Sequence, residues 1–351
     1  MTTIDDLFKE YLRRIQPSDQ AVTRAAESHV PLRDDLEADE EYGPFVEKTM
    51  LSGSYGRNTA TFGIKDVDVI IKTKFTLIDL WERKTDEETE QECLLRLTQA
   101  AIQRTGRAAS TKSARRSIHI RLPENSEHDL PEMTMDIVPV RIQYGADSDP
   151  MTISDCELTQ WFDTYPNTQL DDSQKRNKRS KVISERHHYK PLVKIFKAWK
   201  KANYQRRKTP KGFILECLTA KYHNPTAAHW LDAVHDLFQN ICDEWPDPEN
   251  LPTYPDIPEV HDISDSSPHM IPIAKTREQA QKVLKKIHNH LAIIKQAMAE
   301  AEEDLTKSAE TLRRVFGNDC DVICFPLPED LEESDQSQKS KSNVREAPSF
   351  A

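Results

Sequence analysis

The sequence predicts an α+β protein, with a mixed sheet and its helices first and a helical bundle after it. Short segments of alternating, β-branched composition lie between 46 and 142, whereas the chain after 154 has mainly the apolar periodicity of helices. Only 8 glycines occur against 21 prolines, which argues against a dinucleotide-binding Rossmann fold with its glycine-rich turns. The chain has no apolar run of about 18 residues and no signal-like start, so we expect a cytoplasmic protein without a membrane partner.

The predicted sheet domain covers residues 1–153 and begins with two helices. These helices are predicted over 4–15 and from a cap at Ser18 or Asp19 toward 37. Strands are predicted over 46–52, 66–75, 117–122 and 133–142, with a polar helix over 85–104. This order gives a small mixed sheet with helices on one side.

The predicted helical domain covers residues 154–328. Helices are predicted over 154–164, from about 173 with a restart at Pro191 to 202, and over 211–222, 227–244 and 275–316. The seven prolines within 246–272 predict an extended loop. Residues 329–351 are polar and poor in apolar side chains, and we expect them to form a disordered tail.

Positive charge is concentrated in one segment of an otherwise acidic chain. Residues 175–211 hold fifteen Lys or Arg and one acid, a local charge of +14, so that −25 remains elsewhere out of the net −11. The segment is expected to handle an anion, although a solvated helix face or basic loop would have the same composition. The acidic remainder argues against strong binding of double-stranded nucleic acid.

Cysteine and histidine offer weaker candidates for chemistry. The six cysteines contain no CxxC pair, so reduced thiols are expected. Cys320 and Cys324 come nearest to metal-ligand spacing, but no histidine follows them. Four histidines are expected at the surface or in helix packing: His187, His188, His288 and His290.

A Gly-Ser pair and three acidic residues form the most specific pattern in the sequence. Gly53 and Ser54 directly follow a predicted strand, where backbone N–H groups and a hydroxyl can meet a phosphate. Asp66 and Asp68 occupy alternate positions of the next strand, so both carboxylates point to one face. Asp136 lies among apolar residues of a later strand, where a shared cation would offset the cost of burial.

Three carboxylates facing one point are the oxygen ligands that a pair of Mg²⁺ ions requires, with Mn²⁺ as an alternative. One ion would lower the pKa of an attacking hydroxyl, and the other would hold a triphosphate and neutralise the leaving pyrophosphate. A lone DxD pair is often only a surface feature of a strand. The ordered set of strand, Gly-Ser, DxD and a third Asp is far more specific.

This ordered set resembles the polymerase-β-type nucleotidyltransferases. Within them it is similar to the bacterial cGAS/DncV-like enzymes (SMODS and oligoadenylate-synthase-like), which make nucleotide second messengers in the antiphage CBASS systems. The resemblance covers roughly residues 5–320 and is strongest at 51–71, 133–140 and 187–218. It implies a bilobed enzyme with its active site in the cleft.

The resemblance also implies nucleotide contacts in the helical half. Lys190, Lys194, Lys197 and Lys201 are expected on one helix face, opposite an apolar face formed by Leu192, Ile195, Phe196 and Trp199. The family places a phosphate-contacting lysine on this helix, and either Lys194 or Lys197 matches. Phe213 matches an aromatic residue that stacks on the donor base, although it could equally be core. Gly212 stands where the family usually has serine.

The leading hypothesis is a synthase that joins ribonucleoside triphosphates, ATP among them, into a cyclic di- or trinucleotide. A downstream effector would sense the product, and a ubiquitin-transfer-like partner would act on the C-terminal tail. The alternative enzyme is a template-independent nucleotidyltransferase that tails RNA or modifies a protein or tRNA. A third hypothesis is a non-catalytic scaffold.

Overall fold

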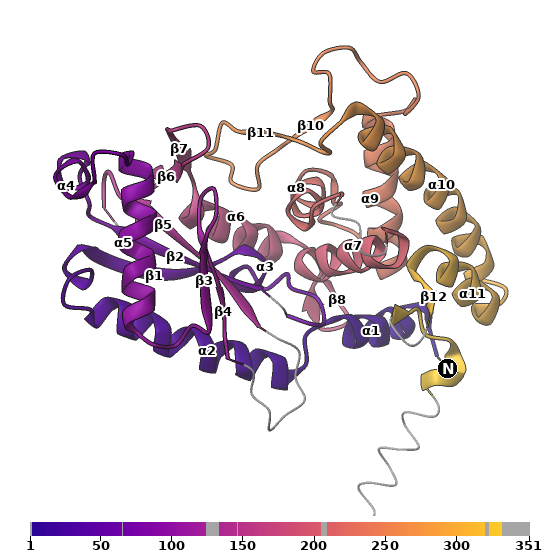
Figure 1. The fold of residues 1–351 in the computed structure, drawn as a ribbon. Coiled ribbons are helices and arrows are strands. Elements are labelled where there is room, and N and C mark those ends of the chain that lie inside the picture. The colour runs from indigo at the N-terminus through magenta and orange to yellow at the C-terminus, as the bar shows by residue number, and fades with distance from the viewer. Residues whose placement is uncertain are drawn as a thin grey trace, which may run out of the picture. The chain divides into compact units, whose positions relative to one another are not determined.

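The chain folds into two compact units, shown in the computed structural model of Figure 1. The structure describes residues 2–64, 66–123, 133–145, 147–204, 209–319 and 323–331. The sheet unit comprises Pro17–Lys175 and Asp262–His269, and the helical unit comprises Met1–Gln16, Arg176–His261 and Met270–Ala351. Among the described residues, no helix combines the length and apolar character that crossing a membrane requires.

The sheet unit confirms the predicted mixed sheet with helices. Its elements are α2 (Asp19–Ala38), the 3-10 turn η1 (Gly43–Phe45), β1 (Val46–Ser52), α3 (Gly53–Gly56), β2 (Asp66–Thr73), α4 (Leu77–Arg83), α5 (Glu90–Arg104), β3 (Ser110–Ser113), β4 (Ile118–Arg121), β5 (Thr134–Arg141), β6 (Met151–Asp155), β7 (Gln160–Thr164) and most of α6 (Pro166–Arg179). Within the described residues the sheet has seven strands in the order β1-β2-β5-β4-β3, and β6 joins β5 to β7. The β2–β5 pair is parallel and the other pairs are antiparallel.

Strand alternation gives the sheet two different faces. In β2, Val67 and Val69 are fully buried in one apolar cluster with side chains of α2 and α5. Asp66 and Asp68 alternate with these residues and therefore point to the opposite face. Asp136 alternates in the same way with the buried residues of β5. The helices thus cover one face, and the predicted catalytic side chains lie on the other.

The prediction of a helix over 154–164 is wrong, because this segment forms the β6–β7 hairpin. Val140 of β5 pairs with Ile153, which adds the hairpin to the sheet. The buried Asp155 carboxylate accepts hydrogen bonds from Arg115 Nε at 2.7 Å and from the backbone N–H of Leu158 at 3.2 Å. Arg115 is distant in sequence from Asp155, so local periodicity could not reveal this contact.

The helical unit confirms the predicted series of helices. Its elements are α1 (Ile4–Ile15), β8 (Val182–Ile183), β9 (Arg186–His187), α7 (Tyr189–Tyr204), α8 (Gly212–Tyr222), α9 (Trp230–Glu244), β10 (Glu259–His261), β11 (Met270–Pro272), α10 (Arg277–Ala301), α11 (Leu305–Phe316), β12 (Asn318–Asp319) and β13 (Ile323–Cys324). The predicted pair over 275–316 is α10 and α11, which pack against each other. The proline-rich segment 246–272 is mostly irregular, but it also contains the short strands β10 and β11.

Packing divides the chain differently from the predicted boundaries at 153 and 154. Helix α1 packs against α7, α9 and α11 and so belongs with the helical unit. Its apolar face is the reason, since Leu7, Phe8 and Tyr11 are fully buried there. The sheet unit extends to Lys175 because it also contains the β6–β7 hairpin and most of α6.

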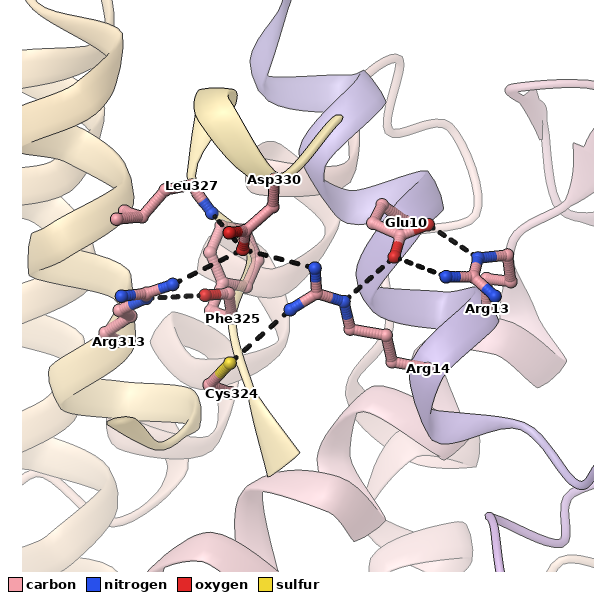
Figure 2. Close-up of polar contacts among 8 residues, drawn as sticks. All are labelled: Glu10, Arg13, Arg14, Arg313, Cys324, Phe325, Leu327 and Asp330. Carbon is pink, nitrogen blue, oxygen red and sulfur yellow. Dashed lines mark hydrogen bonds and ion pairs between the residues drawn. The ribbon is translucent and has the colours of Figure 1, made fainter. Parts of the chain in front are cut away.

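The last described residues are anchored to α1 and α11, as Figure 2 shows. Phe325 is fully buried, and its ring centroid lies 4.9 Å from that of Phe8. The Asp330 carboxylate accepts hydrogen bonds from Arg14 Nη2 at 3.1 Å and from the backbone N–H of Leu327 at 3.0 Å. Beyond residue 331, the predicted disordered tail lies outside the described residues.

The expectation of six reduced thiols is wrong at Cys324, which is disulfide-bonded. Among the described residues, the free thiols are those of Cys93, Cys156, Cys217 and Cys242. Two of the four histidines are buried among the helices, where a packing role was expected: His188 and His290.

Candidate active site

A row of polar side chains crosses four strands of the sheet unit. The register pairs Ser52 of β1 with Asp68 of β2, Asp68 with Asp136 of β5, and Asp136 with His119 of β4. Register partners point to the same face, and neighbouring strands lie about 4.8 Å apart. Asp66 lies two residues before Asp68 and shares this face. The sheet therefore brings all three predicted aspartates onto one surface.

Two of these carboxylates have neighbours that sequence reasoning missed. The Thr134 hydroxyl, which is register-paired with Asp66, donates a hydrogen bond to its carboxylate. His119 Nδ1 lies 3.0 Å from Oδ1 of Asp136. The signal was present in the alternation of residues 117–122, because a strand beside the Asp136 strand must place one side chain opposite the carboxylate.

Gly53 packs directly against the second aspartate. Its φ is +58°, and an ideal Cβ at this position would lie 1.6 Å from Oδ2 of Asp68. Only glycine can both adopt this conformation and leave room for the carboxylate. Ser54 follows in the first turn of the short helix α3, which begins where β1 ends. The Gly-Ser pair therefore sits beside Asp68 because the β1–β2 register ends there.

The donor set of this face fits a hard divalent cation. Carboxylate oxygens are the ligands that Mg²⁺ and Mn²⁺ prefer. The side chain of Asp136 is 39% exposed, so its carboxylate can be reached from solvent. In the part of the chain that the structure describes, no three His, Cys, Asp or Glu side chains already form a closed metal cluster.

Helix α7 differs from the predicted helix with one open basic face, because the four lysines expected on that face differ in exposure. Helix α7 is buried on most sides, and Lys197 lies in its buried surface rather than on an open basic face. Its ammonium donates to a carboxylate oxygen of Glu216 on α8 at 2.7 Å. Lys201 alone of the four expected lysines is exposed, whereas Lys190 and Lys194 are intermediate.

Lys194 lies in a cluster of positive charge within the helical unit. Burial, together with the nearby charges of Arg186, Lys197 and Lys190, lowers its pKa to about 8. A cation held among other cations gains by binding an anion, because the anion offsets both the repulsion and part of the desolvation. Lys194 is partly exposed, whereas Lys197 is buried and its ammonium is paired with Glu216.

Phe213 lies in the first turn of α8 and is only partly buried. Gly212 is the first residue of α8, and its N-cap residue Lys211 makes no side-chain capping hydrogen bond. The partial burial of Phe213 is compatible with base stacking.

Comparison with known proteins agrees with this geometry. The model of the Second Messenger Oligonucleotide or Dinucleotide Synthetase (SMODS) domain matches residues 1–177. A protein of Acinetobacter sp. named cyclic AMP-AMP-AMP synthase is 28% identical over 354 residues, covering 98% of this chain and 92% of its own length.

Two solved structures share the fold at low identity. The Escherichia coli MS115-1 CdnC:HORMA-deltaN complex has a TM-score of 0.66 and 15% identity, covering 90% of this chain and 97% of CdnC. The Vibrio cholerae DncV cyclic AMP-GMP synthase has a TM-score of 0.56 and 12% identity, covering 90% and 86%. Together with the domain match over half of the chain, these findings show that the chain belongs to the SMODS family of cGAS/DncV-like nucleotidyltransferases.

Proposed function

We propose that this chain joins ribonucleoside triphosphates into a cyclic di- or trinucleotide second messenger and releases pyrophosphate. The observation that carries the proposal is the register that sets Asp68 beside Asp136, with Gly53 packed on Asp68. The similarity to a cyclic AMP-AMP-AMP synthase supports ATP as a substrate and a ring of three nucleotides. Such substrates are cytoplasmic, so we propose that the enzyme works in the cytoplasm.

Asp66, Asp68 and Asp136 are the residues proposed to hold two Mg²⁺ ions, or Mn²⁺ in their place. When bound, the ions would lower the pKa of the acceptor hydroxyl and neutralise charge on the triphosphate. Asp136 would help to activate the acceptor 2′- or 3′-hydroxyl for in-line attack on the donor α-phosphorus, with pyrophosphate leaving opposite. Most of the acceleration comes from positioning and charge stabilisation.

Gly53 and Ser54 are proposed to hold the donor phosphates. Because Gly53 has no side chain, the Asp68 carboxylate can lie directly against its backbone. The backbone N–H groups that begin α3 and the Ser54 hydroxyl are donors for phosphate oxygens.

On the helical unit, Lys194 rather than Lys197 is proposed to contact the triphosphate. Lys194 is partly exposed and lies near the positive charges of Arg186 and Lys190, whereas Lys197 is buried. Phe213, which is only partly buried, is proposed to stack on the donor base.

The test is a reaction of the purified protein with the four labelled ribonucleoside triphosphates and Mg²⁺, with no polymer added. Mass spectrometry should find a cyclic product, and Asp66→Asn with Asp68→Asn, or Asp136→Asn alone, should abolish it. Asp86→Asn is the matched control, because Asp86 is an exposed residue of the same unit outside the site. Label found only in added RNA or protein would favour the tailing alternative. An unchanged defence phenotype for the double variant would favour a scaffold.

A regulatory protein partner is supported by CdnC, which was solved in complex with HORMA-deltaN. We further propose a ubiquitin-transfer-like partner that acts on the end of the C-terminal segment, and an effector protein that senses the cyclic product. The Asp330 anchor fixes where this segment leaves the helical unit. Deletion of Ser349–Ala351 should abolish conjugation and leave basal synthesis intact. Conjugates that persist after the deletion would contradict the proposal.

A further inference from the structure

We infer that His119 is a positioning residue for Asp136 and fixes the orientation in which that carboxylate meets the metal and the acceptor hydroxyl. This inference rests on the proposed role of Asp136. It assigns a function to a side chain that lies on a different strand from the three aspartates.

The contact follows from the sheet itself. Strands β4 and β5 are antiparallel, and their register places His119 directly opposite Asp136. His119 Nδ1 lies 3.0 Å from Asp136 Oδ1. An ionised carboxylate only accepts hydrogen bonds, so Nδ1 must carry the proton and donate it. The imidazole therefore holds one carboxylate oxygen and leaves the other available for a ligand.

Each of the three carboxylates has one neighbour on this face that restricts it. Thr134 donates to Asp66, and the backbone of Gly53 packs against Asp68. His119 does the same for Asp136. Neighbours that orient metal-binding carboxylates typically change metal affinity or activity about 10- to 100-fold when they are removed.

If His119 had only a structural role, its loss would mainly lower the stability of the fold. Both side chains of the pair are half-exposed, at 45% for His119 and 39% for Asp136. A polar pair that is open to solvent adds little to the stability of the fold. Loss of the imidazole should therefore change catalysis and metal binding while the unfolding transition stays in place.

The experiment compares three substitutions that differ only in where they can donate. His119→Asn keeps an N–H donor near the position of Nδ1. His119→Gln has its donor near the position of Nε2, and His119→Ala has no side-chain donor. We expect His119→Ala and His119→Gln to lower kcat by about tenfold or more and to weaken Mn²⁺ binding to the nucleotide-free protein by a similar factor. The KM for ATP and the melting temperature should stay unchanged. His119→Asn should restore both kcat and Mn²⁺ affinity.

Asp136→Asn separates failure of this inference from failure of the proposed function. If Asp136→Asn is inactive while His119→Ala keeps wild-type kcat and Mn²⁺ affinity, the inference is overturned and the proposed function stands. The inference is also overturned if His119→Asn is as impaired as His119→Gln, because the donor at Nδ1 then does not matter. If Asp136→Asn itself keeps activity, the proposed function fails. If His119→Ala fails to fold, the kcat and Mn²⁺ affinity of His119→Asn and His119→Gln are compared instead.

Discussion

The indole Nε1 of Trp199 donates a hydrogen bond of 3.1 Å to Nδ1 of His290 in the core of the helical unit. This bond requires Nδ1 to be unprotonated. Burial lowers the pKa of His290 to about 4, and the charges of Lys286 and Arg314 act in the same direction. The unfolded chain, with an ordinary histidine pKa near 6.5, therefore binds more protons than the folded chain at pH values between 4 and 6.5.

We predict that acid destabilises the protein through this histidine. The free energy of unfolding should be constant above pH 6.5 and fall by up to about 3 kcal/mol as the pH drops to 4. Urea unfolding at a series of pH values measures this slope. His290→Asn keeps an acceptor for Trp199 and removes the titration, so its profile should be flatter. An equally steep profile would assign the effect to other groups.

The Lys194 environment predicts a pH dependence of substrate capture. Its pKa, lowered to about 8 by burial and nearby cations, leaves the ammonium charged below pH 8 and neutral above it. If it contacts the triphosphate, kcat/KM for ATP should fall by about tenfold per unit above pH 8. Lys194→Arg keeps its charge and should show no such fall. A wild-type profile that matches the arginine variant would contradict the contact.

The buried pair of Lys197 and Glu216 predicts a large effect on stability. Removing one partner leaves an uncompensated buried charge, so Lys197→Met should lower the free energy of unfolding by about 3–5 kcal/mol. Lys197→Met combined with Glu216→Leu removes both charges and should recover much of this loss. Lys221 and Glu244 form an exposed pair, and Lys221→Met should cost less than about 1 kcal/mol. Denaturant unfolding compares the three variants.

Two glycines between β1 and β2 provide a matched test of the close packing of Gly53 on Asp68. Gly53 and Gly63 both have positive φ, but a Cβ on Gly63 would meet nothing within 4 Å. Gly63→Ala should therefore cost only about 1–2 kcal/mol of backbone strain and keep activity. Gly53→Ala should also displace the Asp68 carboxylate and lower kcat by about 100-fold. Equal activities in the two variants would contradict a role for the packing of Gly53 on Asp68.

The C-terminal anchor predicts that its aromatic residue contributes to the stability of the helical unit. Phe325 is fully buried against Phe8 and Phe316, so Phe325→Ala should lower the free energy of unfolding by about 3–5 kcal/mol. Asp330 is only partly buried, and Asp330→Asn should have a much smaller effect. Thermal unfolding of both variants should show a much larger loss of stability for Phe325→Ala than for Asp330→Asn.

Local pattern predicted four strands of the sheet and the common face of two candidate site residues, for a clear physical reason. The alternation of residues 66–71 specifies both a half-buried strand and a common face for Asp66 and Asp68, because side chains in a strand point to opposite sides in turn. The Gly-Ser pair directly after a strand similarly predicts a turn whose N–H groups and hydroxyl can meet a phosphate. Ser18 caps its helix as expected, since its side chain accepts from the backbone N–H of Ala21.

The sequence by itself determined the four predicted strands, most of the helices and the positions of the acidic trio and the Gly-Ser turn on them, because these depend on neighbours along the chain. Only the tertiary structure decided which residues distant in sequence face one another. It placed His119 against Asp136 and Thr134 against Asp66, buried Lys197 on Glu216, and turned 154–164 into strands. Strand register and helix packing set these pairs, and both are determined by burial of apolar faces across the whole unit.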